Sequence, residues 1–229
     1  MAALEAMGSE STRKIFRKHG ATCDMFGVKV GDMKKLLKPL KNNQTVAMDL
    51  YKTGNSDAMY LAGLVANGAL MSKEELQHWA STAPWNMISE YTVPWVTSEN
   101  NRAMELALEW IESSQESIAS SGWSTLSAIV SITPDDKLDL SILTSLLKRV
   151  QQNIHQSPNR VRYTMNGFVI AVGSFVSPLT KEALNIAEKT GVVTVNMEGT
   201  ECKVPAAGDY IEKVIQRGSV GKKKKTVKC

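Results

Sequence analysis

Residues 56–82 read SDAMYLAGLVANGALMSKEELQHWAST, a stretch in which a short break separates two segments of helix length. The first segment, 56–69, carries apolar residues at helical spacing. The second, 72–82, opens on Ser72 with Glu75 three residues later, which is the pattern of a capping box. A connection this short predicts that the two helices pack as an antiparallel pair.

The same alternation of helical segments and short breaks extends in both directions from this pair. Breaks such as 133–136 and 157–158 contain Pro beside capping residues. The predicted helices span 10–19, 31–41, 43–54, 56–69, 72–82, 85–97, 101–119, 122–132, 138–155, 159–175 and 178–190. The pattern predicts an all-α fold, either a bundle or a solenoid of stacked pairs, whose period of roughly 25–40 residues is that of HEAT-like repeats.

The C-terminal part departs from this pattern. Residues 191–204 are rich in β-branched residues around a Glu-Gly turn, which predicts a small β-hairpin, and a short helix is expected over 205–216. Four consecutive lysines follow Gly221 and predict a mobile basic tail, which either holds phosphates or is only a solvated end. We therefore expect a helical-repeat domain over 1–190, an appendage over 191–217 and a flexible tail over 218–229.

Composition limits the class of protein. The chain has 229 residues, of which 43% are hydrophobic, enough for a sizeable core. It has neither an apolar run long enough to span a membrane nor a secretory signal pattern. Its three cysteines lie far apart and fit neither a disulfide framework nor a zinc ligand set. We expect a cytoplasmic protein without a metal or a cofactor, and the sequence leaves its oligomeric state open.

Charge is unevenly distributed along the chain. Residues 1–52 and 201–229 each carry a formal charge of +5, whereas residues 53–200 carry −6. Two basic ends around an acidic middle suggest an anionic partner. The alternative is that the lysines only keep surface helices soluble.

Common catalytic templates are missing from the sequence. It contains no dinucleotide or phosphate-binding glycine loop, no metalloprotease HExxH and no nucleophile-elbow GxSxG pattern, and its three histidines are isolated. All five tryptophans fall between positions 79 and 123, where they serve either as core residues or as surfaces for base and sugar stacking.

Residues 84–96, PWNMISEYTVPWV, form the densest aromatic window. On a helical wheel, the stripe predicted to face the core contains Met87, Ile88, Tyr91 and Trp95. Trp85 and Ser89 are four residues apart and fall on a second stripe, which is predicted to face a groove. Glu90 points elsewhere on this wheel.

The segment 159–168, NRVRYTMNGF, begins a predicted helix with two arginines. Cations at a helix N-terminus oppose the helix dipole. Arg160 and Arg162 therefore indicate a bound anion or an acidic neighbour, and a structural salt bridge to the acidic middle of the chain is the other interpretation.

Several of these stretches together resemble the bacterial DNA alkylation repair family, the HEAT-like-repeat alkylpurine DNA glycosylases. The similar segments are 26–36, 61–66 with 71–76, Trp85 and 159–168, so the resemblance covers roughly residues 10–190. It implies a right-handed superhelix of antiparallel helix pairs with a concave basic face for duplex DNA. It also implies excision of cationic N3- and N7-alkylated purines.

The family site uses a tryptophan, an aspartate four residues later, an arginine and a second tryptophan. In this sequence the resemblance places Trp85 at the first position and Ser89, which has no charge, at the aspartate position. The arginine position falls near Thr125, and Phe168 takes the place of the second tryptophan. Without a carboxylate beside the developing sugar cation, excision should be weak. Glu90 is the neighbouring carboxylate, and a shifted helix register or a side chain that reaches round would let it substitute.

Three functions follow. The first is a DNA-binding HEAT-like protein with weak or absent glycosylase activity, the second an active glycosylase that uses Glu90 or another carboxylate, and the third a protein-binding scaffold. The expected partner is double-stranded DNA, with alkylated or distorted DNA as candidates. Glu90 is the candidate catalytic residue, and the candidate DNA contacts are Trp85, Ser89, Arg160, Arg162, Phe168, Lys222, Lys223, Lys224 and Lys225.

Overall fold

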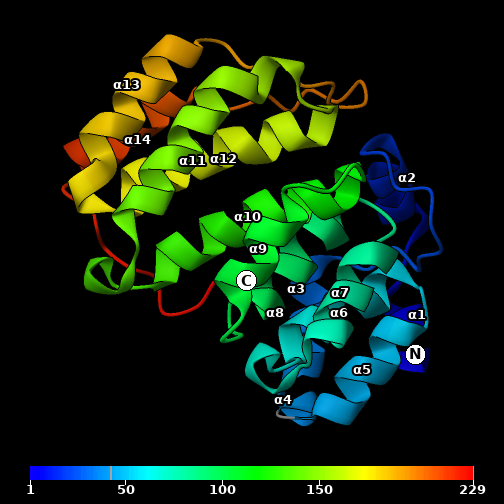
Figure 1. Ribbon diagram of the computed structural model, residues 1–229. Coiled ribbons are helices and arrows are strands. Elements are labelled where there is room, and N and C mark those ends of the chain that lie inside the picture. The colour runs from blue at the N-terminus through cyan, green and yellow to red at the C-terminus, as the bar shows by residue number, and fades with distance from the viewer. Residues whose placement is uncertain (42, 229) are drawn as a thin grey trace.

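The computed structural model describes residues 1–41 and 43–228, and this part of the chain is helical without any β-strand (Figure 1). The α-helices are α1 (Ala2–Met7), α2 (Glu10–Lys18), α3 (Val30–Met33), α4 (Leu37–Leu40), α5 (Gln44–Lys52), α6 (Ser56–Val65), α7 (Lys73–Thr82), α8 (Val93–Thr97), α9 (Ala103–Trp110), α10 (Glu116–Ile132), α11 (Leu140–Asn153), α12 (Asn159–Phe175), α13 (Thr180–Thr190) and α14 (Ala207–Gln216). Short 3₁₀ turns η1 (Lys34–Leu36), η2 (Gly68–Leu70), η4 (Asp135–Lys137), η5 (Ile154–Gln156) and η6 (Ser177–Leu179) join some of them, and η3 (Ile88–Thr92) is a π-helix. The all-α prediction is confirmed.

Two hydrophobic clusters form the core. One contains buried residues from Leu4 to Ile118 and the other buried residues from Ala103 to Ile211. The helix α10 packs against α12 and α9 and also against α8 and η3, so it lies between the two clusters. Figure 1 shows the corresponding arrangement, with α1–α8 in one half, α11–α14 in the other and α10 between them.

The two helices predicted within 56–82 form as α6 and α7, but they do not pack as the predicted pair, because α6 packs mainly against α5 and η3 and α7 packs against α8 and α10. The side chain of Asn55 accepts hydrogen bonds from the backbone N–H of Asp57 and Ala58, at 3.1 and 3.2 Å, and so caps α6. Ser72 and Glu75 form the expected capping box, with N···O distances of 3.2 and 2.8 Å. Each cap satisfies backbone donors that the first helical turn leaves unpaired.

The helix predicted over 159–175 is confirmed as α12, and most of its apolar side chains are buried in the second cluster. Among the described residues, no single helix combines the length and apolar character needed to cross a membrane. The segment from α12 through α13 meets those criteria only as a pair bent by 113°.

The boundary between α9 and α10 differs from the prediction. The predicted helices 101–119 and 122–132 are wrong, because α9 ends at Trp110 and α10 runs unbroken from Glu116 through Gly122. A Cβ atom at Gly122 would lie 2.8 Å from the backbone nitrogen of Ile111 and 2.9 Å from the carbonyl of Ala107. Gly122 therefore lies inside α10, where its missing side chain permits close packing of α9 on α10.

The prediction of one regular helix over 85–97 is also wrong. The chain forms the π-helix η3 and then α8, which has Pro94 in its first turn. Proline has no N–H to donate, and its ring clashes with the carbonyl four residues earlier, at Glu90. Widening of the preceding turn relieves this conflict, and such π-turns often occur at functional sites.

The predicted β-hairpin over 191–204 is wrong. This segment is extended but unpaired, and it buries Val193 and Val195 in the second cluster. The side-chain amide of Asn159 donates to the carbonyl of Asn196 at 2.9 Å and accepts from its backbone N–H at 2.7 Å. A side chain on α12 thus supplies hydrogen bonds that a partner strand would otherwise provide.

Residues 218–228 differ from the predicted mobile tail. They run from α14 back across the molecule to the first half (Figure 1). The ammonium group of Lys223 lies 2.8 Å from Asp135, and that of Lys228 lies 2.9 Å from Glu99. The tail therefore bonds to both halves of the molecule.

Candidate functional site

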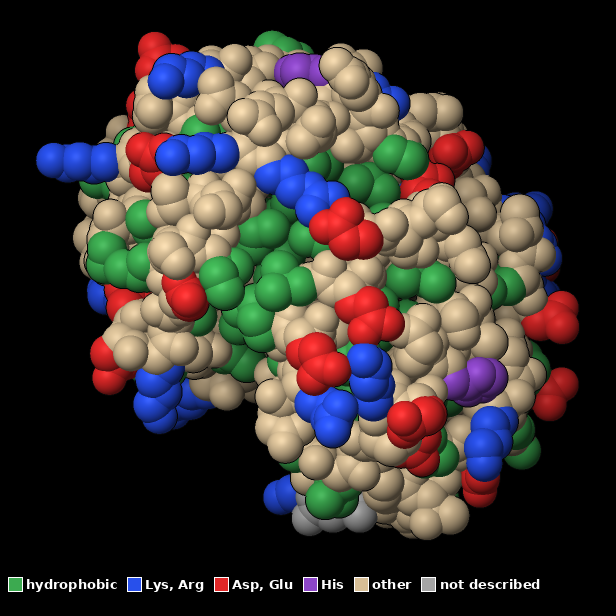
Figure 2. Space-filling view, in the orientation of Figure 1, with side chains coloured by type: hydrophobic (Ala, Val, Ile, Leu, Met, Phe, Trp, Pro, Cys, Tyr) green, Lys and Arg blue, Asp and Glu red, His purple; other side chains and the backbone are tan. Residues whose placement is uncertain are grey.

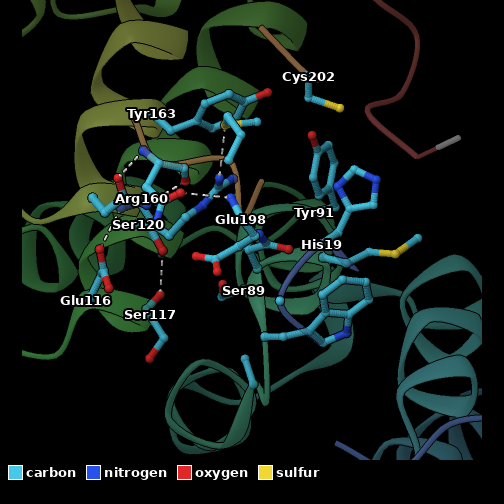
Figure 3. A pocket seen from close by; sticks show the side chains of 18 of the residues that line it. His19, Ser89, Tyr91, Glu116, Ser117, Ser120, Arg160, Tyr163, Glu198 and Cys202 are labelled. Atoms are coloured by element: carbon cyan, nitrogen blue, oxygen red, sulfur yellow. Dashed lines mark hydrogen bonds between the residues drawn. The ribbon is translucent and has the colours of Figure 1, made fainter. Parts of the chain in front are cut away.

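A large open pocket lies between the two halves. It has a volume of about 1210 Å³ and lies where α2, η3, the first turns of α10 and α12, and residues 196–203 meet. Figure 3 shows Glu116, Ser117 and Ser120 on one side of it and His19 and Tyr91 on another, with Arg160 and Tyr163 between. The pocket contains several residues that the sequence singled out.

The π-helix η3 determines which side chains reach this pocket. Ser89 and Tyr91 line it, and Tyr91 is 44% exposed. The side chain of Glu90 is only 2% exposed. The helical wheel placed Tyr91 in the core, and this was wrong because η3 does not follow the α-helical register.

Glu90 is paired with Arg160. The guanidinium donates from Nε to Oε1 at 2.7 Å and from Nη2 to Oε2 at 2.5 Å, so both carboxylate oxygens are occupied. Burial raises the pKa of the Glu90 carboxyl above its usual range, while the charge and hydrogen bonds of Arg160 act in the opposite direction. The two residues are 70 positions apart, and their ion pair connects η3 to α12. Its two parallel hydrogen bonds make it a bidentate pair, which is a strong form of ion pair.

Other groups hold Arg160 in this position. Its guanidinium carbon lies 4.4 Å from the centre of the Tyr163 ring, and its backbone N–H donates to Glu116 at 2.6 Å. The Glu116 carboxylate thus lies at the N-terminus of α12, where the helix dipole favours negative charge. A carboxylate neighbour is therefore confirmed for the Arg160 side chain, which pairs with Glu90, and no ion pair is found for Arg162 among the described residues.

Trp85 and Ser89 both line the pocket, but neither projects far into it. The indole Nε1 of Trp85 donates to Ser56 at 2.6 Å, and its ring lies 5.6 Å from that of Phe16. Ser89 is buried, and its carbonyl accepts a hydrogen bond from Ser121 at 2.6 Å. The two side chains form part of the pocket wall.

Of the remaining candidate residues on α10 and α12, one lines the pocket and two are buried in the core. Arg162 lines the pocket, and its buried Nε has no hydrogen-bond partner within the described chain. Phe168 is completely buried, 5.4 Å from the ring of Trp123, so its expected contact with DNA does not fit this structure. Thr125 is buried too, and its hydroxyl donates to the Ser121 carbonyl at 2.7 Å.

The tail lysines lie away from the pocket. None of the residues 222–225 lines it, and Lys223 pairs with Asp135 and also donates to the Val130 carbonyl at 2.9 Å. Lys222, Lys224 and Lys225 are exposed. On the face shown in Figure 2, Lys and Arg side chains are interspersed with Asp and Glu and do not gather into one basic patch.

Sequence reasoning missed Tyr91, Tyr163 and Glu116 as pocket residues. Tyr163 follows Arg160 by three positions on a helix, a spacing that places the ring beside the guanidinium and was a usable signal. Glu116 had no such signal, because its role depends on how α10 and α12 pack. No group of three or more described His, Cys, Asp or Glu side chains is arranged to hold a metal ion.

The sequence matches a known protein family and two curated proteins. A family model described as DNA alkylation repair enzyme matches residues 1–199. The chain is 34% identical over 220 residues to the uncharacterized protein Lin0241 of Listeria innocua serovar 6a, covering 93% of this chain and 95% of that protein. The uncharacterized protein Lmo0209 of Listeria monocytogenes serovar 1/2a matches with the same identity and coverage.

A solved structure is also closely similar. It is described as a new family of proteins related to the HEAT-like repeat DNA glycosylases with affinity for branched DNA structures. The match has a TM-score of 0.92 and 38% sequence identity, and it covers 100% of this chain and 97% of that one.

Proposed function

The chain belongs to the DNA alkylation repair enzyme family, and from this premise we propose that it binds branched DNA at the pocket with weak or absent glycosylase activity. The helices are expected to form the right-handed superhelix of HEAT-like pairs. The proposed partner is DNA whose duplex arms meet at a distorted point. Cationic alkylated purines are the substrates against which any residual excision should be measured.

The occupied carboxylate of Glu90 carries the proposal. Excision of an alkylated purine leaves positive charge on the sugar, and a free carboxylate stabilises that charge. Both oxygens of Glu90 accept hydrogen bonds from Arg160, and its side chain is 2% exposed. The neighbouring Ser89 has no charge to offer. This arrangement supports binding in preference to bond cleavage.

DNA binding draws support from the structural relative and from the groups around the pocket. That relative is described as having affinity for branched DNA, and the similarity covers the whole of this chain. Arg162, Lys203 and His19 line the pocket and can meet phosphates near its edge. The net charge of +4, with basic ends, favours association with a polyanion.

Fluorescence anisotropy with a four-way junction and a linear duplex of the same arm sequence tests this function. We expect tighter binding to the junction at equal salt, and affinity for both that falls as salt rises. Absence of salt-sensitive DNA binding would remove the proposal and favour a protein-binding scaffold, whose apolar contacts depend little on salt.

An active glycosylase is the second candidate, and one observation favours it. Glu90 lies on the π-helix directly beside Ser89, so the register shift brings a carboxylate next to the pocket wall. Release of 7-methylguanine by the wild type that disappears on Glu90→Gln would establish this function.

A further inference from the structure

We infer that the pocket accommodates an unpaired nucleobase, stacked on the exposed ring of Tyr91. This inference rests on the proposed function, because some branch points, such as those of three-way junctions with unpaired nucleotides, present bases without partners. It goes further by naming the part of the DNA that enters the pocket and the side chain that receives it.

The charges around the pocket do not favour a phosphate inside it. Its lining includes three cationic side chains, Arg160, Arg162 and Lys203, and two carboxylates, Glu116 and Glu198. The Glu90 carboxylate, directly behind Arg160, provides a third negative charge. Three cations against three carboxylates leave little net attraction for an anion, whereas a neutral base incurs no such penalty.

Aromatic surface is what the pocket offers instead. Four aromatic side chains other than Tyr60 line it: Phe16, Trp85, Tyr91 and Tyr163. The rings of Phe16 and Trp85 pack on each other at 5.6 Å, and Arg160 covers one face of Tyr163. Tyr91 is the most exposed of the four at 44%, which leaves ring surface free for a base.

The position of Tyr91 is fixed from behind. Its ring lies 6.3 Å from that of Trp95, at an interplanar angle of 66°, and Trp95 is buried. A supported ring loses little freedom when a base stacks on it, so more of the stacking energy contributes to affinity. Asn86 also lines the pocket, and its side-chain amide offers a donor and an acceptor to the edge of a base.

The size of the pocket fits this occupant. Its volume of about 1210 Å³ exceeds the roughly 300–1,000 Å³ typical of small-ligand pockets, so a base can enter with its sugar and part of a neighbouring nucleotide. Stacking on an aromatic side chain tolerates any base, because every base has a π-face. We therefore expect recognition of an unpaired nucleotide without a strong sequence preference.

The test uses two three-way junctions that differ only in two unpaired nucleotides at the branch point. One junction carries thymines there and the other carries abasic sites, so the phosphate charge is identical. The variants are Tyr91→Ala and, as a matched control, Tyr210→Ala, which removes a 50% exposed tyrosine on α14 outside the pocket. Binding is measured by anisotropy, and folding of each variant by circular dichroism.

We expect the wild type and Tyr210→Ala to bind the thymine junction about 10-fold more tightly than the abasic one, given about 1–3 kcal/mol per stacked base. Tyr91→Ala should bind the two junctions equally. If the wild type binds both junctions equally well, the inference is overturned while the proposed function stands. If it binds neither junction, both fail.

Discussion

Ion pairs join the two halves of this molecule in two regions, and the regions differ in burial. Beside the pocket, Glu90 and Arg160 form a bidentate pair with side chains 2% and 19% exposed. In the tail, Lys223 pairs with Asp135 and Lys228 with Glu99 through single ammonium groups, and these two carboxylate side chains are 29% and 28% exposed, against 2% for Glu90. The first pair is held in a fixed geometry, whereas the second set can exchange with water and salt.

A charged residue that the sequence suggests as a DNA contact can thus be occupied by an ion pair within the chain. Arg160 and Lys223 both looked like DNA contacts, yet each has a carboxylate partner within the chain. The acidic middle of the chain supplies these carboxylates. Part of the charge asymmetry therefore serves the fold.

The largest difference should appear when each kind of pair is broken on its acidic side. Glu90→Ala leaves Arg160 without a partner in a partly buried site, and we expect a loss of about 3 kcal/mol in the free energy of unfolding. Glu99→Ala removes a carboxylate that is 28% exposed, and Lys228 keeps its hydrogen bond to the carbonyl of Ala66, so we expect a loss of about 1 kcal/mol. Urea unfolding measures both, and equal losses would show that the two regions do not differ as described.

The next largest change in stability should come from removing the lysines that anchor the tail, and a second double variant that removes the same charge serves as control. Lys223→Ala with Lys228→Ala removes both anchors, and we expect a loss of about 1–2 kcal/mol because their hydrogen bonds and ion pairs disappear. Lys222→Ala with Lys225→Ala removes the same charge from exposed positions and should change stability by less than about 0.5 kcal/mol. If the two double variants melt together, the tail does not hold the halves.

The control double variant also tests whether the exposed tail lysines contact phosphates. Because residues 222–225 lie outside the pocket, we expect Lys222→Ala with Lys225→Ala to leave the slope of log K against log salt unchanged. A slope reduced by about 2 would instead place both lysines on phosphates and restore the role expected from the lysine run.

The smallest effect, and a pH dependence, should come from the exposed pair between Arg149 on α11 and Glu112 in the connection from α9 to α10. Hydrogen bonding from Arg149 lowers the pKa of Glu112 below its usual range. Since the folded-state pKa is the lower one, the unfolded chain takes up the proton first as pH falls, and stability is lost from the ordinary carboxyl pKa downward. The Glu112 side chain is 63% exposed, so we expect only about 0.5 kcal/mol.

Arg149→Gln should abolish that contribution. Its loss of stability on acidification, followed by urea unfolding across the acid range, should be smaller than that of the wild type by the same amount. An identical acid profile for both proteins would show that the pair contributes nothing.

Local signals predicted much of the fold. The capping box of Ser72 and Glu75 and the periodicity of 159–175 are each local to a single helix, α7 and α12 respectively, and the structure confirms both. The unpaired segment 191–204 was misjudged because β-branched residues favour extended backbone but do not reveal whether a partner strand exists. The break predicted between 119 and 122 was wrong, and the close contact of Gly122 with Ala107 and Ile111 is tertiary, so no local signal reveals it.

The site was less accessible to sequence reasoning. A regular helical wheel cannot represent the π-helix before Pro94, so it placed Tyr91 in the core and pointed Glu90 away from its actual position. The pairing of Glu90 with Arg160 spans 70 residues and depends on how the two halves pack. The idea of a shifted register at Glu90, raised to account for Ser89, nevertheless identified where the local geometry would change.

The most direct test of the central claim, that the pocket binds DNA while its carboxylate is engaged, is release of 7-methylguanine from methylated DNA. The wild type and Glu90→Gln are compared under conditions in which both bind the DNA. We predict base release no faster than from protein-free DNA in either case. Enzymatic release by the wild type that Glu90→Gln abolishes would contradict the account and make Glu90 a catalytic residue.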